Sequence, residues 1–323
     1  MAVYTIITDA MIDRLLLQYD IGKHRALTGI TQGVENTNYK LETDQGHYIL
    51  TIYEKRVDPA DLPFFINLKT HLAEQGYPCP TPVRANDGYV LQKIQGKSMA
   101  IVSFLNGTFT ASPEPPHCHA AGAVLADMHL KGSHFDMQRP NALGKQAWRP
   151  LVEQIKDDVA HTDHSDQMPQ IENWLTGIEQ NWPDRLPQGV IHGDLFPDNV
   201  LFDHTTITGV IDFYFACQDM LAYDLAVMIN AWCFDQSQRF NPDKAKALIT
   251  GYTSNRSLQD DERKAMLVLA RGAALRFYLT RLYDWIHTPA DAQVKPHNPD
   301  DYWHRLMFLH SMDDSAEIGV SHA

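Results

Sequence analysis

A single strand-like segment limits how the second half of this chain can fold. Residues 189–215 contain the short apolar runs of strands, whereas the rest of residues 106–323 has mostly helical periodicity. Helices are predicted over 150–180, 221–234, 243–252 and 260–286. One small β element within a mainly helical region favours a helical lobe that carries a short strand-loop-strand unit.

The first part of the chain has the opposite balance of elements. Strands are predicted at both ends of residues 38–54, joined by a turn in which Gly46 supplies a positive φ, and again over 89–105. Helices are predicted over 9–19 and 59–75, and Gly76 follows the second of them. The sequence therefore predicts an α+β fold of two lobes, a β-rich N-terminal lobe over residues 1–105 and a mainly helical lobe over 106–323.

The charge of the chain argues against nucleic acid as a partner. Its 323 residues include 27 Lys and Arg against 40 Asp and Glu, a formal net charge of −13. No apolar stretch is long enough to span a bilayer, so no membrane partner is expected. The four cysteines form no C-x-x-C pair and indicate free thiols in a reducing compartment, which predicts a cytoplasmic protein. The sequence is compatible with a homodimer but contains no motif that requires one.

Three polar residues in the strand-like segment have a spacing that turn formation alone does not require. Asp194 precedes Asn199 on one loop, and Asp212 follows the apolar run 209–211. A strand-loop-strand unit would bring Asn199 and Asp212 near each other, and their side-chain oxygens are ligands that suit Mg²⁺. Asp194 would then accept the proton of a hydroxyl nucleophile, as phosphoryl transfer requires. The alternative is that these residues supply only turn geometry.

The same spacing occurs in protein kinases, where His-Arg-Asp is followed after four residues by Asn and later by Asp-Phe-Gly. Here the chain reads H-G-D at 192–194, then Asn199, then D-F-Y at 212–214. This pattern resembles the aminoglycoside phosphotransferase and choline kinase superfamily, in which Gly commonly replaces the Arg of the protein-kinase motif. The resemblance implies a protein-kinase-like fold, ATP and Mg²⁺ as cofactors, Asp194 as catalytic base, and Asn199 and Asp212 as metal ligands.

Other stretches agree with this resemblance. Residues 33–39 are similar to the loop that covers the phosphates, which implies nucleotide contacts from Gly33, Asn36, Thr37 and Asn38. Residues 102–105 resemble the segment that reads adenine, which implies contacts from Ser103 and Leu105. Asp224 lies in a stretch similar to the helix start that supports the catalytic loop, and His192 is expected to brace the same loop by packing and hydrogen bonding.

A closer resemblance, to the homoserine kinase branch of this superfamily, is carried by the stretches GVENTNYKLET, YILTIYEKRVDPADLPFF, RPNALG and RGAALRFYLTRLYDW. It implies transfer of the γ-phosphate of ATP to the side-chain hydroxyl of L-homoserine, in threonine biosynthesis. This zwitterion needs a cation for its carboxylate, and the substrate-binding candidates are Arg271, Arg276, Arg281 and Tyr214. The five-residue spacing of the arginines turns successive side chains by about 140°, so one pocket cannot hold all three.

The chain departs from the superfamily at the cation that usually pairs with ATP phosphates. Members usually carry Lys or Arg in the strand that reads YILTIYE here, paired with a Glu on the next helix. These positions correspond to Thr51 and to the apolar run 64–66, and Lys55 is a candidate substitute. Two other functions stay open: a kinase for choline, methylthioribose, fructosamine or an aminoglycoside, and a pseudokinase that binds nucleotide as a regulatory module.

Overall fold

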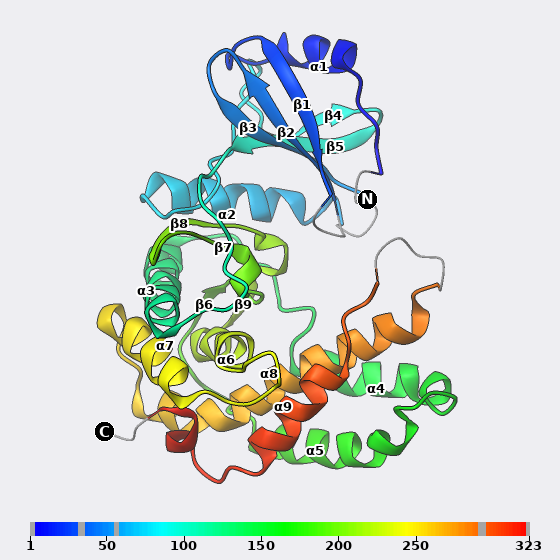
Figure 1. The fold of residues 1–323 in the computed structure, drawn as a ribbon, viewed down its shortest axis with the longest axis vertical. Coiled ribbons are helices and arrows are strands. Elements are labelled where there is room, and N and C mark those ends of the chain that lie inside the picture. Colours follow the sequence, from blue (N-terminus) through cyan, green and yellow to red (C-terminus); the bar gives the residue numbers. More distant parts are fainter. Residues whose placement is uncertain (1–3, 32–35, 55–57, 290–294, 321–323) are drawn as a thin grey trace. The chain divides into compact units, whose positions relative to one another are not determined.

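The computed structural model of the protein describes residues 4–31, 36–54, 58–289 and 295–320. The chain divides into two compact units. The first contains residues 1–107 together with Thr208–Tyr214, and the second contains Thr108–Ile207 and Phe215–Ala323. The predicted α+β class, with a β-rich N-terminal part and a mainly helical C-terminal part, is confirmed (Figure 1). The return of residues 208–214 to the first unit is not predicted by the sequence.

A five-stranded antiparallel sheet forms the centre of the first unit (Figure 1). Its strands are β1 (His24–Ile30), β2 (Thr37–Thr43), β3 (His47–Ile52), β4 (Gln92–Ile94) and β5 (Lys97–Ser103), in the order β1-β2-β3-β5-β4. Alternate side chains of β2 are buried, among them Tyr39 and Leu41, which pair with Leu50 and Tyr48 of β3. Helix α1 (Asp9–Leu16) contributes to the same buried apolar cluster as these strands. The apolar face of the sheet is thereby covered.

The elements of the first unit match the sequence predictions except at Gly46 and at strand β1. Helix α2 (Leu62–Glu74) ends before Gly76, whose φ of 74° stops the helix. Gly46 lacks the predicted positive φ, because the turn is closed by the Thr43 hydroxyl, which accepts hydrogen bonds from the N–H groups of Gln45 and Gly46. Strand β1 is not predictable from periodicity, since none of its residues is fully buried and no alternation results.

Helices form most of the second unit. They are α3 (Pro115–Lys131), α4 (Lys145–Val159), α5 (Met168–Asn181), α6 (Leu221–Trp232), α7 (Pro242–Asn255), α8 (Asp260–His287) and α9 (Asp300–His310). The long helix α8 packs against α4, α5, α6 and α9, while α3 packs against α7. The predicted helix over 150–180 is two helices, and Pro169 lies in the first turn of the second one, where no N–H donor is needed.

Two pairs of short strands carry the loops that the sequence analysis singles out. Strand β6 (Gln188–Ile191) pairs with β9 (Cys217–Met220), and β7 (Val200–Asp203) pairs with β8 (Thr206–Val210). The loop from β6 to β7 contains Asp194 and Asn199, and Asp212 follows β8. The predicted strand-loop-strand character of residues 189–215 is therefore confirmed.

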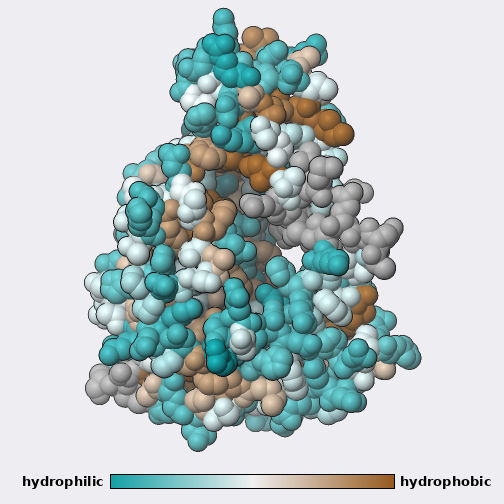
Figure 2. Space-filling model, viewed as in Figure 1, coloured by the Kyte–Doolittle hydropathy of each residue, from teal (hydrophilic) through white to brown (hydrophobic). Residues whose placement is uncertain are grey.

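The described surface is mostly polar. Figure 2 shows hydrophilic side chains over most of the face that it draws. Large exposed apolar side chains, such as Ile6, Leu17 and Met307, are few and scattered along the sequence, which is ordinary for a globular protein. Within the described ranges, we find no helix of the length and apolarity that a bilayer crossing demands.

Candidate functional site

The loop between β6 and β7 presents the predicted base. His192 and Gly193 are buried, Asp194 is partly exposed, and Asn199 is buried again at the end of a short 3-10 turn (Pro197–Asn199). Trp232 of α6 donates a hydrogen bond of 2.8 Å to the carbonyl of Leu195 and so fixes the middle of the loop. A partly exposed carboxylate between buried segments is held on a rigid support.

Asp224 holds the start of this loop from the first turn of α6. Its carboxylate is fully buried and accepts hydrogen bonds from the backbone N–H of His192 at 2.7 Å and of Gly193 at 2.9 Å. His129 of α3 lies 3.1 Å from the same carboxylate and 2.8 Å from the hydroxyl of Tyr252. Burial would raise the pKa of Asp224, but the hydrogen bond with His129, the charges of His129 and His192 and the bond from the His192 N–H outweigh it and lower the pKa.

Gly193 and Arg276 fix the next peptide of the loop. Gly193 has a φ of 73°, and a Cβ at this position would lie 3.1 Å from the carbonyl oxygen of Phe215. The guanidinium of Arg276, on α8, donates a hydrogen bond to the carbonyl of Gly193. It also lies over the ring of Phe277 at 4.3 Å. These contacts commit Arg276 to the loop between β6 and β7, with 4% of the residue exposed.

Asn199 is tied to the backbone of the predicted base. Its Nδ2 donates a hydrogen bond of 2.8 Å to the carbonyl of Asp194, which also accepts the N–H of Phe196 at 2.9 Å. Because the amide nitrogen is used in this way, the amide oxygen is the end suited to a cation. No group of three or more His, Cys, Asp or Glu side chains among the described residues could hold a metal on its own. A carboxylate and an amide oxygen nevertheless suit Mg²⁺, which takes further ligands from phosphates and water.

Asp212 lies in the first unit, directly after β8. It is exposed and has a φ of 65°, a conformation uncommon for a residue with a side chain and found often at functional sites. Tyr214, two residues later, packs edge-to-face on Tyr53, which directly follows β3, and on Phe65 of α2, at ring distances of 5.8 and 5.6 Å. Burial and the neighbouring Tyr53 raise the pKa of Tyr214 well above its usual value. The segment that carries Asp212 is therefore anchored on β3 and α2.

Lys69 belongs to the same cluster and is a residue that sequence reasoning missed. It lies on α2, is 6% exposed, and its ammonium lies over the ring of Tyr214 at 5.5 Å. Burial lowers the pKa of Lys69 to about 8, although nearby Cys79 and Asp212 act to raise it. Lys69 is thus still mainly protonated at pH 7. A lone lysine in an apolar helix gives no signal in the sequence, since lysine usually reaches from such a position to solvent.

The side chains of the predicted phosphate-covering loop are partly used within the sheet. Gly33 and the candidate substitute Lys55 lie outside the described residues. Asn36 accepts the N–H of Glu54 at 3.3 Å, the Thr37 hydroxyl donates to Glu54 at 2.8 Å, and Asn38 accepts the hydroxyl of Thr51 at 2.8 Å. These bonds join the start of β2 to the end of β3 and to Glu54 beyond it, and β2 already begins at Thr37, within the predicted loop.

The predicted adenine-reading segment follows β5. Ser103 accepts the N–H of Thr81 at 2.9 Å with its hydroxyl, and its own N–H donates to the Thr81 carbonyl at 2.9 Å. Phe104 donates its N–H to the carbonyl of His47 at 3.2 Å. Leu105 is partly buried. The backbone of Ser103 and Phe104 is thereby held to the rest of the first unit.

The three candidate arginines of α8 point in different directions, as their spacing predicts. Arg271 donates to the carbonyls of Leu309 and Met312, at 3.1 and 2.6 Å, and so ties α8 to the C-terminal segment. Arg276 holds the catalytic loop, as described above. Arg281 is paired with Asp301 of α9 at 3.2 Å, and 15% of its side chain is exposed.

Tyr302 links Arg281 to the surroundings of Asp194. The Arg281 guanidinium lies 4.6 Å from the centre of the Tyr302 ring, which stacks on Phe277. Burial raises the pKa of Tyr302, and the charges of Arg305, Arg281 and Asp194 also act on it. The buried Tyr302 hydroxyl has no hydrogen-bond partner among the described residues. A buried hydroxyl without a partner, near one cation and one anion, is suited to a polar ligand.

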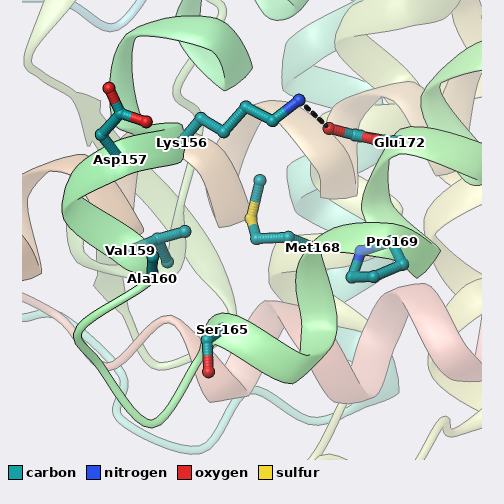
Figure 3. Close-up of a pocket in the computed structure, with 8 residues that line it drawn as sticks. All are labelled: Lys156, Asp157, Val159, Ala160, Ser165, Met168, Pro169 and Glu172. Atoms are coloured by element: carbon teal, nitrogen blue, oxygen red, sulfur yellow. Dashed lines mark ion pairs between the residues drawn. The ribbon is translucent and has the colours of Figure 1, made fainter.

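A surface pocket of about 470 Å³ lies elsewhere, where α4 and α5 meet (Figure 3). Lys156 and Glu172 form an ion pair of 3.1 Å at this pocket, and Met168 and Val159 contribute its apolar lining. None of the residues singled out by the sequence analysis lies in it. The pocket therefore has no part in the site described above.

Sequence comparisons agree with the motifs. The model of a phosphotransferase enzyme family matches residues 26–258. Proteins named homoserine kinase from Paramagnetospirillum magneticum and Rhodospirillum rubrum are 47% and 48% identical to this chain. Each alignment covers 99% of this chain and 100% of the relative.

Solved structures share the fold at low sequence identity. An amicoumacin kinase in complex with AMP-PNP and Ca²⁺ has a TM-score of 0.70 at 15% identity, over 97% of this chain and 93% of the other. A spectinomycin phosphotransferase in complex with ADP and spectinomycin has a TM-score of 0.70 at 14% identity, over 97% of both chains. A choline kinase from Cryptosporidium parvum has a TM-score of 0.64 at 14% identity, over 88% of both. The predicted protein-kinase-like phosphotransferase fold is confirmed.

Proposed function

Because the chain belongs to the phosphotransferase enzyme family, we propose that it transfers the γ-phosphate of ATP to the side-chain hydroxyl of L-homoserine. The observation that carries this proposal is the identity of 47% and 48%, over nearly the whole chain, to relatives named homoserine kinase. The alignments extend over both units of the chain, so the likeness is not confined to the nucleotide-phosphotransfer motifs.

We propose Asp194 as the base that accepts the proton of the attacking hydroxyl. The Asp194 carbonyl is bonded to Asn199 and Phe196, and the preceding peptides are held by Asp224, so the backbone around the carboxylate is fixed. A base held in this way needs no rearrangement before the proton moves. The hydroxyl oxygen then forms its bond to the γ-phosphorus as ADP leaves, and the products are O-phosphohomoserine and ADP.

We propose Asn199 and Asp212 as the ligands of Mg²⁺, because an amide oxygen and a carboxylate are oxygen ligands that suit this ion. Bound Mg²⁺ would neutralise the phosphate oxygens on which charge develops. The strained backbone of Asp212 and the oriented amide of Asn199 are what this chain contributes toward such a cation. His192 and Asp224 support the catalytic loop in this scheme.

On the nucleotide side, we propose that the predicted loop acts mainly through its backbone. The side chains of Asn36, Thr37 and Asn38 are engaged by Glu54 and Thr51, which leaves the main chain as the group that would contact phosphates. Ser103 and Leu105 are proposed to contact adenine through their main chain. Backbone groups can recognise a purine or a phosphate without any particular side chain.

For the amino-acid substrate, we propose Arg281 as the carboxylate ligand. Arg271 and Arg276 each bond main-chain carbonyls. Arg281 donates to the Asn298 carbonyl at 3.3 Å and pairs with Asp301, but its guanidinium also lies beside the ring of Tyr302, whose hydroxyl has no partner among the described residues. Tyr214 packs in the first unit against Tyr53 and Phe65, so we assign it to packing rather than to substrate contact.

A substrate panel tests the proposed function. ATP consumption with L-homoserine, choline, methylthioribose, fructosamine and an aminoglycoside is expected to give the highest kcat/KM with homoserine. Product identification by phosphorus NMR should place the new phosphate on the side-chain oxygen. A preference for any other alcohol would overturn the homoserine assignment, and ATP binding without turnover of any of them would indicate a pseudokinase.

Replacement of Arg281 tests the carboxylate site. Arg281→Met is expected to raise KM for homoserine about 10- to 100-fold, since hydrogen bonds to charged groups contribute roughly 1.5–3 kcal/mol. KM for ATP should stay near the wild-type value. The matched control is Arg271→Met on the same helix, which should leave both KM values unchanged and lower only stability. Equal homoserine KM values in the two variants would exclude Arg281 as the ligand.

A further inference from the structure

One buried charge in the first unit lacks the kind of partner that buried charges normally have. Among the described residues, the buried Lys, Arg, Asp and Glu side chains are Lys69, Asp224, Glu262, Arg276 and Arg305. All but Lys69 have hydrogen bonds or ion pairs: those of Asp224 and Arg276 are given above, Glu262 pairs with Arg256 at 2.9 Å, and Arg305 donates to the Asn230 carbonyl at 2.7 Å. For Lys69, the interactions with described residues are of another kind: its ammonium lies over the Tyr214 ring at 5.5 Å and is subject to the charge of Asp212.

A buried charge without a compensating partner is costly, so its position needs an explanation. The ammonium lies on the ring of Tyr214, and the carboxylate of Asp212 is near enough to act on it. Both belong to the segment 208–214 that follows β8. Lys69 is therefore directed at the segment that carries a proposed metal ligand.

The neighbouring strand contributes no cation of its own to this cluster. β3 and the residue that follows it contribute Thr51 and Tyr53. The Thr51 hydroxyl donates to Asn38, and the Tyr53 ring packs on Tyr214. The corresponding part of α2 contributes Phe65, which packs on the same ring. Among the described residues of this cluster, Lys69 is thus the cation that α2 adds to Thr51, Tyr53, Phe65, Tyr214 and Asp212.

We infer that Lys69 binds the phosphates of the nucleoside triphosphate beside Asp212, an inference that rests on the proposed phosphotransfer function. A triphosphate carries several negative charges, and kinases bind it with cations as well as with metal. A lysine ammonium serves phosphate as a compact point charge. The bound phosphates would supply the partner that the buried ammonium otherwise lacks.

A purely structural role for Lys69, as a counter-ion that stabilises Asp212 and its segment, makes a different prediction. In that case removal of the ammonium would destabilise the protein without a specific effect on phosphate binding. If the Lys69 ammonium instead binds the phosphates of the nucleotide, removal of its charge relieves a desolvation cost in the nucleotide-free protein. In that case, removal of the charge lowers the affinity for phosphates without lowering the melting temperature.

The variant Lys69→Met keeps the length of the side chain and removes its charge. We expect kcat/KM for ATP to fall about 10²- to 10³-fold, as for the loss of one preorganised group at a developing charge. Affinity for ADP and AMP-PNP should fall, adenosine affinity should stay unchanged, and the melting temperature should stay equal or rise. The control Lys93→Met, on the exposed strand β4, should leave all four quantities unchanged. A folded Lys69→Met protein with wild-type affinity for AMP-PNP would overturn the inference.

A relocated charge provides a second readout. Thr51→Lys in the Lys69→Met background places an ammonium on β3 within the same cluster. Recovery of part of the lost AMP-PNP affinity is expected if the cluster needs a cation for phosphates. A structural counter-ion on α2 would not be replaced in this way, because the new side chain starts from another element.

Chemical labelling tests the wild-type protein, so it decides the question even if Lys69→Met fails to fold. With an acyl phosphate of ATP, the amine of a lysine near the phosphates attacks the acyl carbon, forms an amide and releases ATP. Peptide mapping is expected to find the acyl group on Lys69, with excess ATP preventing it. Acylation of other lysines alone, protected by ATP, would overturn the inference. Neither labelling nor AMP-PNP affinity requires homoserine, so failure of the substrate assignment is recognised separately.

Discussion

Asp194→Ala is expected to reduce turnover about 10²- to 10⁴-fold, the range that a positioned general base contributes. The variant removes the carboxylate that would orient the substrate hydroxyl and accept its proton. The loop should keep its shape, because the Asp194 carbonyl, which the substitution retains, accepts hydrogen bonds from Asn199 and Phe196. Steady-state kinetics with saturating ATP and homoserine measure the loss, and AMP-PNP affinity should be nearly unchanged.

The matched control for this experiment is Asp198→Ala. Asp198 lies on the same loop, carries the same charge and is exposed. Its removal tests whether a general loss of negative charge near the loop reduces turnover, and we expect kcat within a few-fold of wild type. If Asp194→Ala and Asp198→Ala retain similar activity, Asp194 has no role in the chemical step.

Asp224→Ala is expected to destabilise the protein by about 3–5 kcal/mol, the cost of leaving a buried charged or polar network without one partner. The substitution leaves the backbone N–H groups of His192 and Gly193 and the ring of His129 buried without their acceptor. Urea denaturation followed by circular dichroism measures the change. Activity should fall as well, because the peptides that precede Asp194 lose their anchor.

Asp243→Ala is the matched control for stability. Both aspartates lie in the first turn of a helix, but Asp243 is exposed. Its loss should cost within about 0.5–1 kcal/mol, the range of surface and helix-terminus effects. Equal costs for the two variants would mean that the hydrogen bonds of Asp224 contribute little.

The pH dependence of stability provides a check on the same carboxylate. The folded protein lowers the pKa of Asp224 below its usual 3.8, so the unfolded state binds the proton more readily. The stabilisation from Asp224 is therefore fully present above pH about 4 and is lost as pH falls through the lower, folded value. The difference in unfolding free energy between wild type and Asp224→Ala should stay constant from pH 7 to 5 and shrink in stronger acid.

The sequence allows the catalytic loop to be predicted because its residues are close together in the chain. Asp194 and Asn199 lie on one loop, and the spacing of this loop from Asp212 is a property of the chain alone. Strand β2 is equally accessible to prediction, since its side chains alternate between buried and partly buried positions.

Features that depend on contacts between distant segments are not predictable in this way. Lys69 sits in the run LPFFINLKTHLAE, where a single lysine normally reaches solvent, and only its contact with Tyr214 makes it a buried charge. The directions of Arg271 and Arg281 can be separated by helix geometry, but their partners on α9 and the C-terminal segment cannot. Nor does periodicity reveal that residues 208–214 belong to the first unit.

The return of residues 208–214 to the first unit has a consequence for the order in which the protein folds during its synthesis. A ribosome that has released only residues 1–107 has not yet supplied Tyr214, which packs on Tyr53, Phe65 and Lys69. The first unit therefore cannot complete its packing until residues 208–214 have been synthesised, and these follow the loop of Asp194 and Asn199 in the chain. For the same reason, gene recombination at position 107 would not transfer a complete first unit, because the segment that carries Asp212 would be left behind.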